Sequence, residues 1–364
     1  MVFVTLFTRL ENVHLLKDVG MIPYILHRDH GVDSIVVSAR NEEDYPYIRN
    51  EVKGLKLQFL KKHPVSPLIA GMKYVWKNAE KIDVLNVYHL NLSSFLYLLI
   101  YKLRKKPSGK GYLKLDMDLK GYKRLFMKNP VGLIKRLTMW LADVISVETT
   151  VLSQKLKIKY GRKVLYIPNG FYASEPARDF NKENIILTVG ALGTYAKATD
   201  TLLRAFAGAA AGNDWKLELV GPIAQDFKPF IRDFLSRHED LKDRIHFTGE
   251  IRDKEKLAEI YRRAKIFVLP SRSESFGIVL LEAAANGDFL ITTTGVPAGR
   301  DIYNDGKFGF IVPPDDIPAL SGSFVRLMNS SADWDSRARE IADYAWHDFR
   351  WEPIVSKLYE VLNR

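Results

Sequence analysis

The sequence predicts an α/β protein with two doubly wound domains, each a parallel sheet covered by helices. Three observations support this fold class. Apolar runs rich in β-branched residues recur along both halves, helix-length segments fill most of the gaps between them, and one polar segment interrupts the alternation near the middle. The length of 364 residues also favours two domains over one.

The expected strands follow directly from the apolar runs. In the first half they lie at residues 2–8, 34–38, 83–89, 111–116, 143–148 and 164–168. In the second half they lie at residues 184–190, 215–221, 244–249, 265–271, 289–293 and 309–313. The segments "TDTLLRAFAGAAA" and "KEKLAEIYRRA" carry apolar residues at helical spacing, which predicts crossover helices between the strands of the second half.

The polar segment "IPNGFYASEPARDFNKEN" (167–184) is the expected joint. We therefore predict an N-terminal domain at 1–172, a C-terminal domain at 173–345 and a final helical segment at 346–364. Doubly wound sheets bind ligands beyond the carboxyl ends of their strands, so two facing domains would form a cleft between them. Helical spacing in the final segment is carried by Trp351, Ile354, Val355, Leu358 and Leu362.

The composition excludes several classes of site. The chain has no cysteine, so disulfides and thiolate metal sites are impossible, and a reducing compartment fits. The opening "MVFVTLF" is short, lacks a preceding basic flank and is typical of a strand rather than a signal peptide. The longest apolar stretch (90–103) is shorter than the roughly 20 residues of a bilayer-spanning helix. We expect a cytoplasmic protein.

Positive charge is concentrated in the first half. Residues 1–172 carry 29 Lys and Arg against 14 Asp and Glu, whereas the remainder carries a net charge of −4. In two segments, 102–111 and 120–128, Lys and Arg alternate with Tyr, Leu and Phe. These segments are either a solvated face or a contact with anionic lipid headgroups, where each basic residue contributes roughly 1 kcal/mol.

The stretch "ESFGIVLLE" (274–282) holds the sharpest chemical signal. Glu274 and Glu282 would not share a face if all nine residues were helical, so we predict a loop that becomes a helix near Phe276 or Gly277. Ser273 and Ser275 are candidate N-caps, and Asn286-Gly287 is a candidate stop. Free amides at such a helix start form an anion site that a glycine lets a phosphate approach.

This arrangement suits a nucleotide-sugar. The amides would bind the diphosphate while one carboxylate accepts bonds from sugar hydroxyls and the other from ribose hydroxyls, each bond contributing on the order of 1.5 to 3 kcal/mol. The alternative is a solvated glutamate before a helix and a second on its exposed face. Spacing alone leaves both open.

The surrounding sequence favours the first alternative. The segments "LTVGALGTYAKATDTLLRAF", "LELVG", "HFTGEIRDKEKLAEIYRRAKIFVLPS", "ESFGIVLLEAAANG" and "NDGKFGFIVPPDD" occur in this order. Residues 184–315 thereby resemble the C-terminal domain of family-4 retaining glycosyltransferases of the GT-B fold, and "DVISVETTVLSQKL" extends the likeness loosely into the first half. The resemblance implies two Rossmann-like domains and a C-terminal helix that crosses back to the first, with the acceptor bound by the N-terminal domain.

The resemblance also assigns roles to single positions. Glu274 matches the contact to the donor sugar, Glu282 the contact to the ribose, and Lys197 the lysine on the donor phosphates. The arginine that usually follows the strand's glycine is Ala191 here. Arg272, beside the expected anion site, would either compensate for it or be an ordinary surface arginine. The remaining donor-binding positions that the resemblance implies are Gly20, Gly193, Ile251, Ser275, Phe276, Gly277 and Ile278.

The first half departs from the family pattern. Gly20 is the sole candidate for the usual glycine-rich turn, and an ordinary turn is the alternative. The usual active-site histidine is absent from "YLKLDMDLKGY", where Asp116 or Asp118 would replace it as a sugar or acceptor contact. His89, which ends a neighbouring strand, is the other candidate, with a structural histidine as the alternative. "DMD" mimics a metal motif of another fold, but we expect no divalent metal and no cofactor.

The sequence therefore predicts a retaining glycosyltransferase that uses a UDP- or GDP-sugar and a saccharide or lipid-linked acceptor in the synthesis of cell-envelope polysaccharide or glycolipid. It would act in the cytoplasm or on the inner face of the cytoplasmic membrane, and no nucleic acid partner is expected. A nucleotide-sugar epimerase or hydrolase of the same architecture is the enzymatic alternative. A basic protein that binds anionic polymers is the non-enzymatic alternative.

Overall fold

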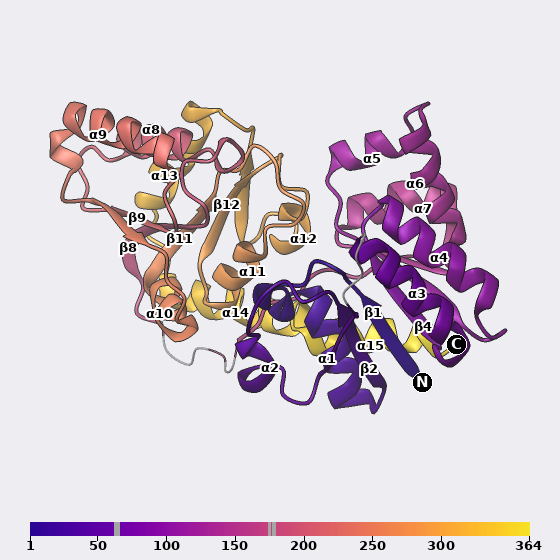
Figure 1. Cartoon of the computed structure of the whole chain (residues 1–364). Helices are drawn as coiled ribbons and strands as arrows, with labels where there is room; N and C mark the ends of the chain where they lie inside the picture. Colours follow the sequence, from indigo (N-terminus) through magenta and orange to yellow (C-terminus); the bar gives the residue numbers. More distant parts are fainter. Residues whose placement is uncertain (62–65, 174–175, 177–179) are drawn as a thin grey trace. The chain divides into compact units, whose positions relative to one another are not determined.

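The computed structural model describes residues 1–61, 66–173, 176 and 180–364. The chain divides into two compact units, one formed by Met1–Tyr172 with Phe349–Arg364 and the other by Ala173–Asp348 (Figure 1). Each unit is a parallel sheet with helices, so the predicted α/β class is confirmed. Part of the expected joint, residues 174–175 and 177–179, lies outside the described residues.

Within the described residues, the first unit holds a seven-stranded parallel sheet in the order β3-β2-β1-β4-β5-β6-β7. Chain order reverses between β1 and β4, which makes this pair the topological switch point of the sheet. The strands are β1 (Val2–Leu6), β2 (Asp33–Ser38), β3 (Lys56–Phe59), β4 (Val84–Tyr88), β5 (Lys110–Leu115), β6 (Val144–Val147) and β7 (Val164–Tyr166).

Strand β3 is the one strand of this sheet that the sequence did not predict. It lies at the sheet edge, and its residues alternate between exposed and half-buried. An edge strand with one solvated face needs no continuous apolar run, so the signal used for the other strands is missing.

Helices cover both faces of the first sheet. One face is packed by residues such as Phe3, Ile22 and Trp351, and the other by residues such as Leu98 and Leu113. The helices are α1 (Asp18–His30), α2 (Pro46–Asn50), α3 (Pro67–Asn78), α4 (Leu92–Arg104), α5 (Leu119–Leu125), α6 (Pro130–Leu141), α7 (Thr150–Tyr160) and α15 (Trp351–Leu362).

Helix α15 belongs to the first unit although it ends the chain. The five residues predicted at helical spacing, Trp351, Ile354, Val355, Leu358 and Leu362, are all buried. The helix packs against α1 (Figure 1). At this contact the rings of His30 and Tyr359 stack with centroids 4.3 Å apart. The unit boundary falls after Asp348 rather than after residue 345, because Trp346 packs with Phe180 in the second unit.

The second unit repeats the architecture with a six-stranded sheet, again counted over the described residues, in the order β10-β9-β8-β11-β12-β13. Its switch point lies between β8 and β11. The strands are β8 (Glu183–Val189), β9 (Lys216–Val220), β10 (Ile245–Gly249), β11 (Ala264–Leu269), β12 (Phe289–Thr293) and β13 (Gly309–Val312). The helices are α8 (Thr199–Ala209), α9 (Lys228–Arg237), α10 (Lys254–Arg263), α11 (Ile278–Ala285), α12 (Gly299–Ile302), α13 (Ile317–Met328) and α14 (Trp334–Asp348).

The helices were compared with the length and hydrophobicity that a membrane-spanning helix needs. In the parts of the chain that the structure describes, none of them is both long and apolar enough to cross a bilayer. The stretch flagged in the sequence forms α4, which has 13 residues and buries Tyr97, Leu98 and Tyr101 against its own unit.

Candidate active site

The loop between β11 and α11 leads into the helix start at which an anion site is predicted. Helix α11 begins at Ile278, and its N-cap is Gly277, which has a φ of +86°. A Cβ at this position would also approach Leu269 to 2.9 Å, so glycine is required for both backbone and packing reasons. The helix start is confirmed, whereas the prediction that Ser273 or Ser275 caps it was wrong. The first amides of the helix have no intrahelical acceptor and are available to an anion.

Lys197 and Glu274 meet beside this helix start. The Lys197 ammonium donates to Glu274 Oε1, and the Ser271 hydroxyl donates to the same oxygen at 3.1 Å. Ser271 is fully buried, while the two charged side chains keep 26% and 17% of their surface exposed. The main-chain N–H of Glu274 donates to the Gly295 carbonyl at 3.0 Å, which fixes the loop. Both charges are thus held in place while still accessible to a ligand.

Glycines allow the loop that carries Lys197 to lie close to its neighbours. A Cβ on Gly221, after β9, would fall 1.9 Å from the Gly190 carbonyl oxygen, after β8. Gly193 has a φ of +83°, and its N–H donates to the Thr199 hydroxyl at 2.8 Å. The Gly193 amide therefore shapes the turn instead of pointing at a ligand.

Arg272, which the sequence leaves as either a compensating donor-binding cation or an ordinary surface arginine, is instead a cross-link between loops. Its guanidinium donates to Asp315 at 2.7 and 2.9 Å, to Asp200 at 3.0 and 3.1 Å and to the Tyr195 carbonyl at 2.7 Å. The hydrogen bond to Asp315 raises the pKa of Arg272 further. Two carboxylates neutralise this cation, so it does not replace the missing family arginine. Ala191 itself is exposed.

Glu282 lies in the second turn of α11 and is oriented by α10. The Tyr261 hydroxyl donates to its Oε2 at 3.1 Å, and the Lys254 ammonium lies 3.8 Å from its Oε1. Tyr261 is buried, and burial together with Glu282 raises its pKa well above the ordinary value. Ile251 is half-buried in the loop before α10. Sequence reasoning missed Lys254 and Tyr261, although both lie in the segment quoted for the resemblance.

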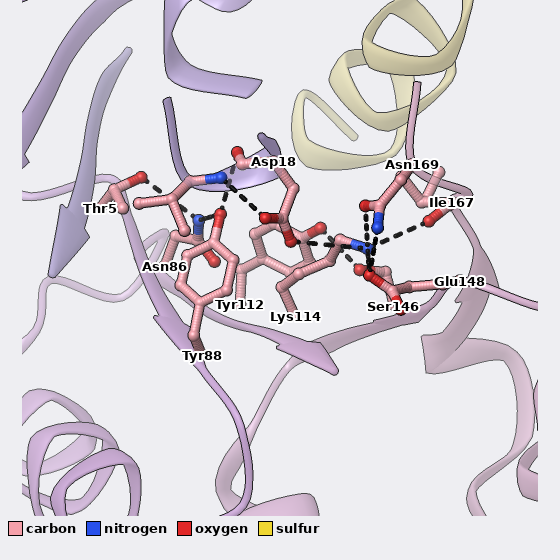
Figure 2. Close-up of polar contacts among 11 residues, drawn as sticks. Thr5, Asp18, Asn86, Tyr88, Tyr112, Lys114, Ser146, Glu148, Ile167 and Asn169 are labelled. Carbon is pink, nitrogen blue, oxygen red and sulfur yellow. Dashed lines mark hydrogen bonds and ion pairs between the residues drawn. The ribbon is translucent and has the colours of Figure 1, made fainter. Parts of the chain in front are cut away.

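The first unit contains a buried charged cluster at the carboxyl ends of β5 and β6. Lys114 is fully buried, and its ammonium lies 3.3 Å from Glu148 Oε1 and 3.8 Å from Asp18 Oδ2. It also contacts the Ile167 carbonyl at 3.3 Å. Asn169 donates to Glu148 Oε1 at 2.7 Å. Figure 2 shows these groups converging on the lysine from β5, β6, α1 and the segment after β7.

Acids outnumber the single lysine in this cluster. Burial, and to a smaller extent the nearby carboxylates of Asp116 and Asp18, raise the pKa of Glu148 to about 8 against the attraction of Lys114. Burial also raises the pKa of Asp18. Glu148 Oε2 is buried and has no hydrogen-bond partner among the described residues. Sequence reasoning missed the cluster, because Lys114 and Glu148 lie 34 positions apart.

The two aspartates of "DMD" have different positions. Strand β5 ends at Leu115, and Asp116 is exposed just beyond it. Asp118 is the N-cap of α5, where its Oδ1 accepts from the Gly121 N–H at 2.6 Å. Asp118 therefore has a structural role, which corrects its place among the catalytic candidates, and Asp116 remains a candidate.

His89 lies at the switch point of the first sheet. It has a φ of +63°, which is uncommon outside glycine, and its ring packs near Phe7 at 6.3 Å between centroids. It lines a pocket of about 710 Å³ together with Arg9, Asn41 and Ser93, at the carboxyl ends of β1 and β4. Open α/β sheets bind ligands at this location.

Gly20 is not part of a loop after β1. It lies in the first turn of α1, where a Cβ would approach the Leu15 carbonyl oxygen to 2.2 Å. Close packing of the preceding turn onto α1 explains this glycine without a ligand, which corrects its predicted role. Within the described residues, no group of three or more acidic or histidine side chains is placed to hold a metal ion.

Comparisons with known proteins match the second unit most directly. Residues 173–345 match the family described as glycosyl transferases group 1. A glycogen synthase of Mycobacterium tuberculosis (strain CDC 1551 / Oshkosh) is 33% identical over 115 residues, which cover 32% of this chain and 27% of that protein. A phosphatidyl-myo-inositol mannosyltransferase of Mycolicibacterium smegmatis is 27% identical over 217 residues, which cover 56% and 53%.

A solved structure extends the likeness to the whole chain. The Anabaena protein Alr3699/HepE, crystallised in complex with UDP, covers 100% of this chain and 99% of its own with a TM-score of 0.75 at 15% identity. This likeness shows the fold. The matched regions span only 27% and 53% of the two curated relatives. Residues 173–345 thus match the glycosyl transferases group 1 family, and the fold of the chain is GT-B.

Proposed function

We propose that the protein is a retaining glycosyltransferase that moves a sugar from a UDP- or GDP-sugar to a hydroxyl of a saccharide or lipid-linked acceptor. The observation that carries this proposal is the Lys197–Glu274 pair beside the start of α11, within the domain that matches the family. A cation, a carboxylate and helix amides are the groups that a diphosphate-linked sugar requires.

One carboxylate oxygen of Glu274 accepts hydrogen bonds within the protein, and the other can accept them from a ligand. Lys197 and Ser271 both donate to Oε1, whereas the described residues supply no hydrogen-bond partner for Oε2. A carboxylate oxygen accepts two hydrogen bonds, so Oε2 can accept from hydroxyls of the donor sugar. Glu282 is held by Tyr261 and Lys254 and would accept from the ribose hydroxyls at the other end of the donor.

Lys197 would stabilise the leaving diphosphate. Its ammonium has three N–H donors, so it can keep its bond to Glu274 and still donate to phosphate oxygens. The amides at the start of α11 supply further fixed donors, and Gly277 allows phosphate to approach the backbone. Donors placed before the charge develops contribute several kcal/mol to transition-state stabilisation. Because Lys197 and the helix amides already supply donors to the diphosphate, we propose that no metal ion takes part.

The first unit would bind the acceptor in the pocket that His89 lines. Arg9, Asn41 and Ser93 offer donors and acceptors to saccharide or phosphate groups. Asp116 is the accessible acid at the neighbouring strand end and replaces the usual family histidine as a contact to the acceptor. A lipid-linked acceptor is supported by the likeness to the phosphatidyl-myo-inositol mannosyltransferase and by the basic first unit. The protein would then work at the inner face of the cytoplasmic membrane in cell-envelope polysaccharide or glycolipid synthesis.

The experiment measures release of nucleoside diphosphate from a panel of UDP- and GDP-sugars, with and without saccharide acceptors. We expect turnover that needs an acceptor and falls steeply in Glu274→Ala and Lys197→Ala, while Lys242→Ala, an exposed lysine on the same unit, behaves like the wild type. Wild-type turnover in both site variants would refute the site. Full release of nucleoside diphosphate without an acceptor would instead favour a hydrolase, and conversion to an isomeric nucleotide-sugar without release would favour an epimerase. The anomeric form of the transfer product, read by NMR, tests retention.

A further inference from the structure

Helix α6 exposes apolar side chains that neither the donor site nor the acceptor pocket uses. Side chains of this size are mostly buried in folded domains. Here, however, Trp140 exposes 79% of its surface and Leu133 exposes 51%. Leu133, Leu137 and Trp140 follow i, i+4, i+7 spacing, so they form one stripe along the helix, the α6 stripe. Gly132 and Met139, on another side of α6, are buried, which leaves the stripe facing outward.

The chain around the stripe is strongly basic. Between residues 117 and 141 there are six Lys or Arg and a single carboxylate, Asp118, which already caps α5. Lys120, Lys123, Arg124 and Lys128 are exposed on α5 and on the link to α6. Exposed Met127 lies in the same link.

The link between α5 and α6 is fixed in place rather than loose. Arg136 donates to the carbonyls of Leu125 and Met127 at 3.1 and 3.0 Å. From α7, the Lys159 ammonium lies 4.5 Å from the centroid of the Phe126 ring. This contact brings α7 against the link. The basic and apolar groups therefore belong to one ordered surface.

We propose that the α6 stripe and the cations around it dock the first unit onto an anionic lipid bilayer. Apolar side chains would enter the boundary between headgroups and acyl chains while Lys and Arg bind the headgroups, the usual combination for proteins that lie on a membrane. This proposal rests on the proposed function, because docking on the bilayer would bring the protein to a lipid-linked acceptor.

A second copy of the chain is a poorer occupant. Two-fold pairing would place the same surface on both partners. Lys120, Lys123, Arg124 and Lys128 would then face their own copies, and the one carboxylate of this segment, Asp118, already caps α5. Anionic lipid supplies the missing complementary charge.

Sedimentation with phosphatidylcholine vesicles, with and without phosphatidylglycerol, tests this surface in the full chain without donor or acceptor. We expect binding that needs phosphatidylglycerol, weakens as salt rises, and falls by about tenfold or more in Trp140→Glu and in Leu133→Glu/Leu137→Glu. The matched control is Val325→Glu, an exposed apolar position on α13 of the second unit, which should bind like the wild type. Lys123→Gln/Lys128→Gln should weaken binding to the phosphatidylglycerol vesicles and make it less sensitive to salt.

A second readout separates docking from simple charge attraction. Lipids with a quencher on the acyl chain should quench part of the wild-type tryptophan fluorescence, and Trp140→Phe should remove that part while vesicle binding persists. Unchanged binding in both glutamate variants would overturn the proposal, as would dimerisation that Trp140→Glu abolishes in a protein that ignores vesicles. Failure of either kind leaves sugar transfer to a soluble acceptor intact, so it is distinguishable from failure of the proposed function.

Discussion

Replacing Glu148 by glutamine should change how stability depends on pH. Glu148 is buried beside Lys114, with a pKa of about 8 in the folded protein against an ordinary value of 4.5. The folded state therefore keeps its proton to higher pH than the unfolded state. The stabilising contribution is complete below the ordinary pKa and is lost as pH rises toward the folded pKa.

The size of this effect follows from the same two values. A difference of one pKa unit corresponds to 1.36 kcal/mol, so the whole interval between 4.5 and about 8 is worth about 5 kcal/mol. Roughly 3 kcal/mol of that contribution is lost by about pH 7. Glutamine keeps the shape of the neutral acid and cannot ionise, so Glu148→Gln should gain stability relative to wild type as pH rises.

The assay is thermal and denaturant unfolding of both proteins from about pH 5 to pH 8.5. Buried Asp288, whose pKa burial raises to about 8, titrates in both proteins and cancels from the difference. The control is Glu239→Gln, because Lys242 lowers the pKa of this exposed carboxylate and confines its effect to acid pH. A Glu148→Gln difference that is the same at every pH, or a loss of stability at all pH values, would show that Glu148 is ionised beside Lys114 and would refute the reasoning.

Three further predictions concern the two units. Gly221→Ala should lower the free energy of unfolding by more than about 2 kcal/mol, because the added methyl would lie 1.9 Å from the Gly190 carbonyl oxygen. The melting temperature should fall accordingly. Gly212→Ala, also at a positive φ (+72° against +138° for Gly221) but with open space around it, should cost much less, and equal losses would contradict this. Asp118→Ala should lower the free energy of unfolding by about 1 kcal/mol and leave turnover normal, because Asp118 caps α5. Asp116→Asn should slow turnover and leave stability normal. The reverse pattern would restore Asp118 as the functional acid. Turnover should persist in excess chelator, and activity that manganese or magnesium restores would show a metal requirement.

Backbone features were largely predictable from the sequence because they depend on local patterns. Apolar runs located most strands, and helical spacing located α15 with its five buried residues. The start of α11 followed from Phe276-Gly277. Its cap did not, because the N-cap position is taken by Gly277 in a left-handed conformation rather than by Ser273 or Ser275.

The ion pairs and hydrogen bonds of side chains were much less predictable, because they form between residues far apart in sequence. Arg272 is neutralised by Asp200 and Asp315, which lie 72 and 43 positions away. Lys114 meets Glu148 only because β5 and β6 are neighbours in the sheet. Proximity to a motif therefore suggested a ligand role for Arg272, while the structure gives it an internal one.

The central claim is that the second unit binds a nucleoside diphosphate through Lys197 and the start of α11. Isothermal titration calorimetry of UDP and GDP with wild type, Lys197→Met and the exposed-lysine control Lys242→Met measures this directly. Loss of a charge-assisted bond worth about 1.5 to 3 kcal/mol predicts that Lys197→Met binds roughly tenfold to a hundredfold more weakly, while Lys242→Met matches the wild type. Equal affinity of Lys197→Met and wild type for the diphosphate would contradict the account.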